Sequence, residues 1–187
     1  MDGSLSRQIP SQVVVLAEDE RHQRFMRYYL QRLGFRQHAL RFMALPAGRG
    51  CGEQWVREQY AEAVTAYRTR STHAKSALVV VLDADNSAVE KRVEQLKMEL
   101  IQADLNPRTA NEKIVHLIPR RNIETWVLSL TGSDVDEQAD YKQENGIDSK
   151  LHEAAAAFWD LARSHAVPPN NGLPSLLKAI HELRRLE

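Results

Sequence analysis

The chain has 187 residues, and its 25 Lys and Arg balance 25 Asp and Glu, so the formal net charge is zero. This length suits one domain with a sizeable core, and a hydrophobic fraction of 43% excludes an intrinsically disordered chain. The single cysteine, Cys51, excludes an intramolecular disulfide and a cysteine-based zinc site. Because the sequence has neither an apolar signal segment nor a run long enough to cross a bilayer, we expect a cytoplasmic protein without membrane contact.

The neutral average conceals an uneven distribution of charge. Residues 1–80 contain 12 Lys and Arg against 7 Asp and Glu, whereas residues 81–187 contain 13 against 18. This split predicts a basic surface beside an acidic one, although scattered solvated charges would give the same counts. The overall neutrality weighs against tight nonspecific binding of polyanions.

Hydrophobic periodicity predicts strands that alternate with helices. Short Val-rich runs are typical of strands buried on both faces, and apolar residues at three- and four-residue steps are typical of amphipathic helices. The first helix should end at Gly34, which is a favourable residue just beyond a helix. The alternation predicts an α/β fold with a mainly parallel central sheet covered by helices on both faces. We expect strands at residues 12–17, 41–45, 76–82 and 113–118, and helices at residues 21–33, 53–70, 88–103 and 123–130.

The remaining sequence differs in composition from this core. Residues 131–150 are polar and acidic, which indicates a loop or insertion between an α/β core at 1–130 and a small helical C-terminal extension at 151–187. The extension should contain helices at 151–166 and 175–186, the second capped by Ser175. The apolar stripe of the last helix is expected to dock on the sheet, with docking on a partner as the alternative.

Acidic side chains follow two of the predicted strands. Glu18 comes directly after the first strand, and Asp83 and Asp85 follow the strand at 76–82. The carboxyl ends of neighbouring parallel strands meet at one edge of a sheet, and alternate residues of an extended segment point the same way. Mg²⁺ binds a few carboxylate oxygens and keeps several waters. The sequence therefore predicts a metal site, with ordinary turn and capping residues as the alternative.

These segments carry a resemblance to a known family. Residues 13–18, the Gly-rich loop at 46–52 and residues 79–85 (VVVLDAD) resemble a Toprim domain, a Rossmann-like α/β metal-binding module of topoisomerases, DnaG-type primases and OLD-type nucleases. Residues 118–126 (IPRRNIETW) are similar to a segment of small stand-alone RloB-like proteins of bacterial defence loci, in which an acid-plus-aromatic helix follows the last strand. The resemblance spans about residues 12–130.

The resemblance implies a function and a set of site residues. Glu18, Asp83, Asp85 and Glu124 would be catalytic, and the first three would bind Mg²⁺ or Mn²⁺. The implied activity is that of a Mg²⁺-dependent nuclease acting on nucleic acid, DNA rather than RNA, in phage defence. The implied partner is an ABC-type ATPase. A homo-oligomer is a further expectation, which the resemblance itself does not supply.

Two positions depart from the family pattern. Asp19 stands where a Gly often follows the first Glu, and Ser87 stands at the third acidic position of the Asp-x-Asp motif. Glu124 or Glu20 would have to supply the missing carboxylate. The missing acid favours the alternative of a non-catalytic Toprim-like subunit that binds nucleic acid or a protein partner.

Candidate phosphate ligands lie in two loops. Arg49 in the Gly-rich loop, with Arg120 and Arg121, is suited to bidentate contacts with phosphate. The backbone N–H groups of residues 48–52 precede a helix and would form a second anion cradle. An ordinary turn and surface charges are the alternative interpretations.

A third interpretation is a receiver-like phosphoacceptor domain. Residues 14–20 (VVLAEDE) and the helix after them are close to how receivers begin, and Asp83 would be the phosphoacceptor. The 65 residues between Glu18 and Asp83 are long for a receiver, and the later strand end carries arginines where a receiver has a lysine. The seven histidines form no His-x-x-x-His pair, which argues against a zinc protease.

Overall fold

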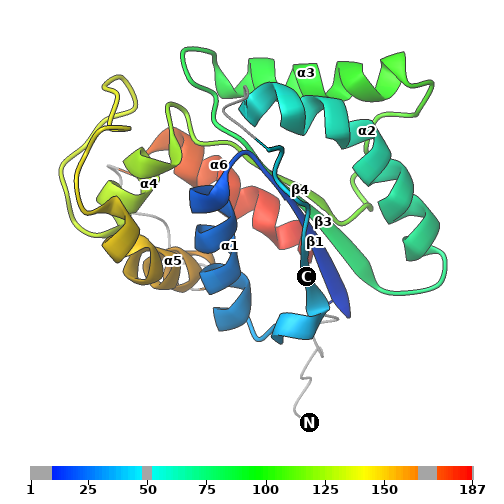
Figure 1. Ribbon diagram of the computed structural model, residues 1–187, viewed down its shortest axis with the longest axis horizontal. Helices are drawn as coiled ribbons and strands as arrows, with labels where there is room; N and C mark the ends of the chain where they lie inside the picture. The colour runs from blue at the N-terminus through cyan, green and yellow to red at the C-terminus, as the bar shows by residue number, and fades with distance from the viewer. Residues whose placement is uncertain (1–9, 48–51, 164–171, 187) are drawn as a thin grey trace, which may run out of the picture.

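The computed structural model describes residues 10–47, 52–163 and 172–186. Within them, strands and helices alternate as expected and then give way to helices alone (Figure 1). The elements are β1 (Gln12–Ala17), α1 (Glu20–Arg32), a 3₁₀ turn (Gln37–Ala39), β2 (Leu40–Phe42), α2 (Gly52–Ser71), β3 (Ser76–Val81), α3 (Val89–Gln102), β4 (Ile114–Leu117), α4 (Ile123–Leu130), α5 (Ile147–Arg163), α6 (Pro174–Leu183) and a final 3₁₀ turn (Arg184–Leu186).

The described strands form one parallel sheet in the order β2-β1-β3-β4. β1 and β3 lie side by side in the middle, with Val15 opposite Val79 and Ala17 opposite Val81. This confirms the predicted α/β class. The expected strand at 41–45 is shorter, Leu40–Phe42, whereas the other strand and helix ends before residue 131 lie within a residue of their predicted positions.

Helices cover both faces of the sheet (Figure 1). On one face α2 and α3 bury Tyr60 and Leu96 against Leu78 and Val80. On the other face α1, α4, α5 and α6 form a second core, which contains the aromatic residues Phe25, Trp126 and Phe158. Because side chains alternate along a strand, β1 and β3 contribute to both cores, which is why every residue after the first in each strand is apolar.

The C-terminal helices complete a layer of this core. α5 begins at Ile147, four residues before the expected start at 151, and it packs on α1 and α4. α6 packs on β4, and its Leu176, Ile180 and Leu183 are buried in the core, as expected for docking on the sheet. The expected extension is therefore continuous with the α/β core. Among the described residues no helix is both long and apolar enough to cross a membrane.

Side chains form hydrogen bonds with the backbone groups on the outer edge of β4. The backbone N–H of His116 donates to Glu182 of α6 at 3.1 Å, and Arg108 donates to the carbonyl of Ile114 at 2.7 Å. Arg108 also pairs with Glu182, at 2.6 Å and 3.0 Å. An edge strand normally leaves such groups open to another chain, so these contacts close the sheet on this side.

Ser175 has a different role from the predicted helix cap. α6 begins with Leu173 as its N-cap and Pro174 at the first helical position, where the missing N–H of proline costs nothing. The Ser175 hydroxyl instead accepts from the backbone N–H of Arg120 at 3.1 Å and from Trp126 Nε1 at 2.8 Å. The capping prediction is wrong because these long-range donors claim the hydroxyl.

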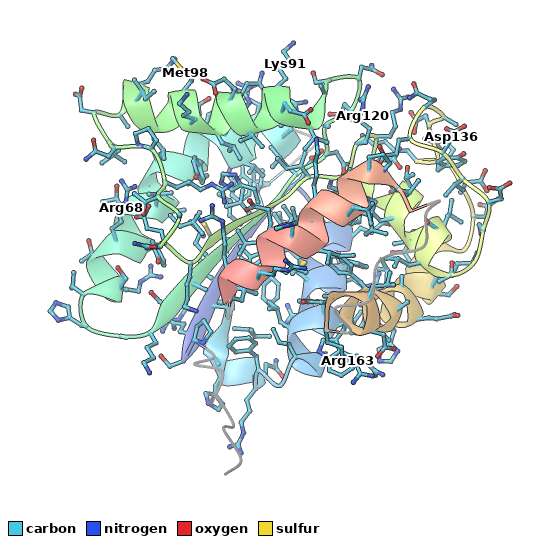
Figure 2. The ribbon with its side chains drawn as sticks, turned by 180° about the vertical axis from the view of Figure 1, so that it is seen from behind. Arg68, Lys91, Met98, Arg120, Asp136 and Arg163 are labelled. Atoms are coloured by element: carbon cyan, nitrogen blue, oxygen red, sulfur yellow. The ribbon has the colours of Figure 1, made fainter. Side chains whose placement is uncertain are left out.

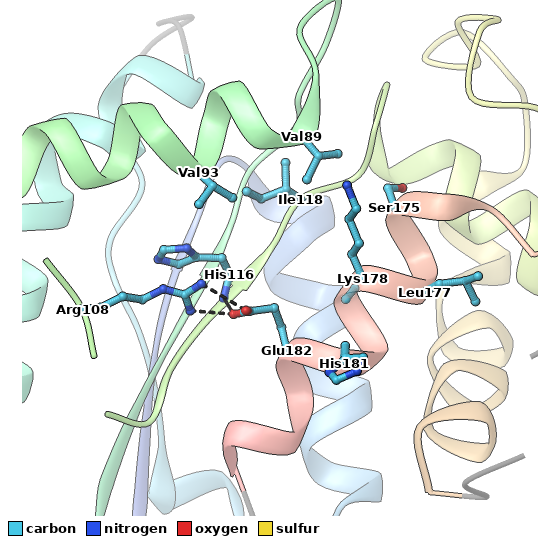
Figure 3. A pocket seen from close by; sticks show the side chains of 11 residues that line it. Val89, Val93, Arg108, His116, Ile118, Ser175, Leu177, Lys178, His181 and Glu182 are labelled. Atoms are coloured by element: carbon cyan, nitrogen blue, oxygen red, sulfur yellow. Dashed lines mark hydrogen bonds and ion pairs between the residues drawn. The ribbon is translucent and has the colours of Figure 1, made fainter. Parts of the chain in front are cut away.

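A groove of about 460 Å³ lies between α3 and α6, over β4. Figure 3 shows Val93 and Ile118 along one side, Lys178 on the other, and the Arg108–Glu182 pair across it. His116 lines the groove, and burial lowers its pKa well below the ordinary value, so its imidazole is neutral.

Candidate metal centre

The carboxyl ends of β1 and β3 bring Glu18 and Asp83 together. The backbone N–H of Glu18 donates to the carbonyl of Val81 at 3.0 Å, which continues the sheet by one residue. The backbone N–H of Asp83 in turn donates to Glu18 Oε2 at 2.8 Å. The structure therefore places these two predicted site residues next to each other.

His22 joins this pair from the first turn of α1. Asp19 is the N-cap of α1, and its Oδ1 accepts from the backbone N–H of His22 at 3.0 Å and lies 2.7 Å from His22 Nδ1. The opposite ring nitrogen, Nε2, lies 2.9 Å from Asp83 Oδ1. His22 and Asp83 are buried, with 1% and 2% of their surfaces exposed. An imidazole is therefore held between two carboxylates.

The donor atoms of Glu18, His22 and Asp83 lie within 4.8 Å of one another. Two ligands of a shared ion, each about 2.0–2.2 Å from it, stand no more than about 4.4 Å apart. Small side-chain shifts would bring the three donors into that range. Two carboxylates and one imidazole form a ligand set suited to divalent cations, so these residues fit a metal ion.

Protonation is strongly perturbed in this cluster. Burial and the negative charge of Asp83 raise the pKa of Glu18 to about 7. Burial alone would lower the pKa of His22, but the charges of Asp83 and Asp19 and their hydrogen bonds to the ring raise it well above its ordinary value. Burial also raises the pKa of Asp83, against the opposing effect of His22. Without a metal ion the cluster holds protons, which a cation must displace.

Asp85 lies outside this group of donors. Its backbone is left-handed, with φ of 51°, and its N–H donates to the carbonyl of Arg121 at 3.1 Å. Alternate side chains point the same way only along an extended backbone. Because the backbone at Asp85 is left-handed, the side chains of Asp83 and Asp85 do not share a direction. Asp85 Oδ1 lies 2.9 Å from Lys142 Nζ, and Oδ2 lies 3.3 Å from Arg92 Nη2.

Glu124 supplies a further buried carboxylate from α4. It is 4% exposed and accepts a hydrogen bond from Arg21 through Oε1, whereas Oε2 has no partner within the part of the chain that the structure describes. Burial raises the pKa of Glu124, and the charge of nearby Asp83 adds to the effect. Glu124 is therefore within electrostatic range of the cluster.

A polar hollow of about 430 Å³ adjoins the cluster on the side of α1. The hollow is lined by Asp19, Glu20, Arg21, Arg24 and Asp148. Glu20 is the second acid that the sequence offered in place of the missing carboxylate at Ser87. Both arginines are directed at Asp148, at 2.9 Å and 2.8 Å. Sequence reasoning did not consider these two arginines, whose guanidinium groups are paired with Asp148 and, for Arg21, also with Glu124.

The predicted phosphate ligands have other partners. Arg120, which lies near the start of α6 (Figure 2), donates to the backbone carbonyls of Asp85, at 3.3 Å, and Ser87. Arg121 donates to Asn86. Both arginines therefore hold the turn after β3. Arg49 lies outside the described residues.

Gly52, at the start of α2, lies against Glu18. A Cβ atom at this position would stand 2.4 Å from Glu18 Cγ and 2.9 Å from its carbonyl oxygen. Only glycine allows this approach, so the end of the Gly-rich loop helps to fix the Glu18 side chain.

His22 was missed because its role cannot be read from a motif. The available signal is its place one turn after Glu18, at the start of a helix that leaves the carboxyl edge of the sheet. The fold and the cluster together define an α/β protein with a parallel sheet and an acid–histidine centre at its carboxyl edge. The chain matches no family model, no curated protein and no solved structure.

Proposed function

We propose that this protein is a divalent-metal-dependent nuclease whose centre is formed by Glu18, His22 and Asp83. The observation that carries the proposal is the convergence of their donor atoms within 4.8 Å at the carboxyl edge of the sheet. Open α/β sheets bind ligands at this edge, and buried groups with perturbed pKa values gather at functional sites.

The side chains have distinct roles in this proposal. His22 and Asp83 hold the ion, which when bound would polarise a phosphodiester and lower the pKa of a water molecule. Glu18 would share the ion with them, and its pKa of about 7 in the metal-free protein means that metal binding near neutral pH has to displace a proton from its carboxyl group. Arg21 and Arg24 line the adjoining hollow, where they would bind the phosphates of the nucleic acid in exchange for their present partner, Asp148.

The ligand set bears on the choice between Mg²⁺ and Mn²⁺. Mg²⁺ prefers oxygen ligands alone, whereas imidazole nitrogen raises the affinity for transition metals. We therefore propose Mn²⁺ as the stronger-binding cofactor and Mg²⁺ as the weaker one. Replacing His22 with Asp, which restores an all-oxygen set, should reduce the preference for Mn²⁺.

The two alternative functions, a receiver-like domain and a non-catalytic nucleic-acid-binding subunit, make different demands on Asp83. A receiver-like domain needs Asp83 to accept a phosphoryl group, and its 2% exposure together with the His22 contact opposes that access. A non-catalytic nucleic-acid-binding subunit needs no accessible carboxylate, and it would retain binding when Asp83 is changed.

Cleavage of labelled oligonucleotides tests the proposal. Single- and double-stranded DNA and RNA are incubated with the protein and Mn²⁺ or Mg²⁺, and Asp83→Asn is compared with Glu62→Gln, which changes an exposed carboxylate on α2. We expect metal-dependent cleavage that Asp83→Asn reduces at least 100-fold and Glu62→Gln preserves. Binding without cleavage would support the non-catalytic alternative. Labelling of Asp83 by acetyl phosphate would support the receiver.

A further inference from the structure

Lys142 reaches the centre from the polar segment at residues 131–146, which connects α4 with α5. Its Nζ lies 2.9 Å from Asp85 Oδ1, although the two residues are 57 positions apart in the sequence. The segment therefore returns to the carboxyl edge of the sheet and delivers a positive charge there.

The charge of Lys142 acts on the whole acidic cluster. Partial burial opposes the effect, but the hydrogen bond to Asp85 and the charges of Asp83, Asp85 and Glu18 raise the pKa of Lys142 to about 12. The ammonium group is therefore within electrostatic range of two residues of the proposed metal centre, as well as of Asp85.

The two cations on Asp85 differ in how firmly they are held. Arg92 is buried and also donates to the carbonyl of Asp83 at 3.2 Å and to Glu53 at 2.9 Å. Lys142 has 42% of its side chain exposed, and within the part of the chain that the structure describes it forms its ion pair with Asp85. A flexible, solvated ammonium group is displaced more easily than a guanidinium fixed by four acceptors. Lys142 is therefore the exchangeable partner of Asp85.

We propose that Lys142 is a positioning residue that sets the affinity of the centre for its divalent cation. It holds Asp85 apart from Glu18, His22 and Asp83, and it adds a positive charge that an incoming cation must overcome. This inference rests on the proposed metal centre. It also gives a role to the ion pair of Asp85, which the Asp-x-Asp motif predicts as a ligand and which a left-handed turn directs at cations instead.

Titration of the purified full chain with Mn²⁺ alone, followed by isothermal calorimetry in 0.05 M NaCl, tests the inference. Lys142→Met removes the charge and keeps a long, unbranched side chain, whereas Lys142→Arg keeps the charge. Lys91→Met is the matched control, because Lys91 projects outward from α3 (Figure 2). Circular dichroism and urea unfolding of each variant show whether it is folded.

We expect Lys142→Met to bind Mn²⁺ about 10-fold more tightly than the wild type, which is about 1.4 kcal/mol. Lys142→Arg and Lys91→Met should bind as the wild type does. The 10-fold difference should shrink in 0.5 M NaCl, because salt screens the charge of a partly exposed side chain. A merely structural role of Lys142 would weaken metal binding in the Met variant and would not give tighter binding.

Two results would overturn the inference, and they are distinguishable. Equal or weaker Mn²⁺ binding by folded Lys142→Met refutes the role of Lys142 and leaves the metal centre standing. A lack of Mn²⁺ binding by the wild type and by every variant refutes the metal centre and the role of Lys142 with it.

Discussion

Replacing Glu18 with Gln tests how far burial has raised the pKa of the Glu18 carboxyl group. The Gln side chain can still accept the backbone N–H of Asp83, as Glu18 Oε2 does at 2.8 Å, but it carries no charge at any pH. Burial and Asp83 raise the pKa of Glu18 from 4.5 to about 7. Between these values the folded chain keeps a proton that the unfolded chain releases, so the wild type loses stability as the pH rises.

The size of the effect follows from the pKa values. The interval from 4.5 to about 7 corresponds to about 3 kcal/mol, at about 1.4 kcal/mol for each pH unit. The wild type loses this free energy of unfolding as the pH rises, whereas Glu18→Gln has no carboxyl group to titrate there. Between pH 4.5 and pH 8 the stability of the variant relative to the wild type should therefore rise by about 3 kcal/mol. For a chain of this length the same change is about 6–12 °C in Tm.

Urea unfolding at a series of pH values, monitored by circular dichroism and tryptophan fluorescence, measures this difference. Glu62→Gln on α2 is the control, because it removes an exposed carboxylate and should show no such trend. A wild-type-to-variant difference that stays constant from pH 4.5 to pH 8 would refute the perturbed pKa of Glu18. It would also remove the expectation that Mn²⁺ displaces a proton from Glu18 near neutral pH.

Three further predictions concern the same centre and the edge of the sheet. Binding of Mn²⁺ at pH 6 should release protons from Glu18 and His22, which calorimetry in buffers of different ionisation enthalpy detects as a buffer-dependent heat. Gly52→Ala should weaken Mn²⁺ binding at least 10-fold in calorimetry, because its Cβ would displace Glu18, and unchanged binding would refute that contact. Ser175→Ala should lower the free energy of unfolding by about 2 kcal/mol in urea titrations, because it leaves the buried Trp126 Nε1 without its acceptor. Ser133→Ala, on the 131–146 segment, is the control and should leave the free energy of unfolding unchanged.

The sheet could be predicted because its signals are local. β1 and β3 are short β-branched runs between turn residues, and no helical period competes with them. The acids that follow the two strands could be placed at one edge once the sheet was taken as parallel, and the structure puts Glu18 beside Asp83. The start of α5 was misplaced because its first turn is polar and resembles the preceding loop.

The finer geometry depends on tertiary contacts that no local pattern contains. His22 is a functional candidate only because α1 starts at the meeting point of β1 and β3, so that its ring reaches both Asp19 and Asp83. Asp85 departs from the expected direction because its backbone turns left-handed, which the Asp-x-Asp spacing does not reveal. Lys142 reaches Asp85 through a segment whose composition predicts only a loop.

The closure of β4 by α6 has a consequence during synthesis of the chain. β4 and its neighbours can form a sheet as soon as residue 117 has left the ribosome, but Glu182 and Ser175 arrive much later. Until then the nascent sheet presents an open edge, which can recruit a strand from another chain. We therefore expect chains truncated before residue 174 to aggregate, and those that retain α6 to remain monodisperse in light scattering.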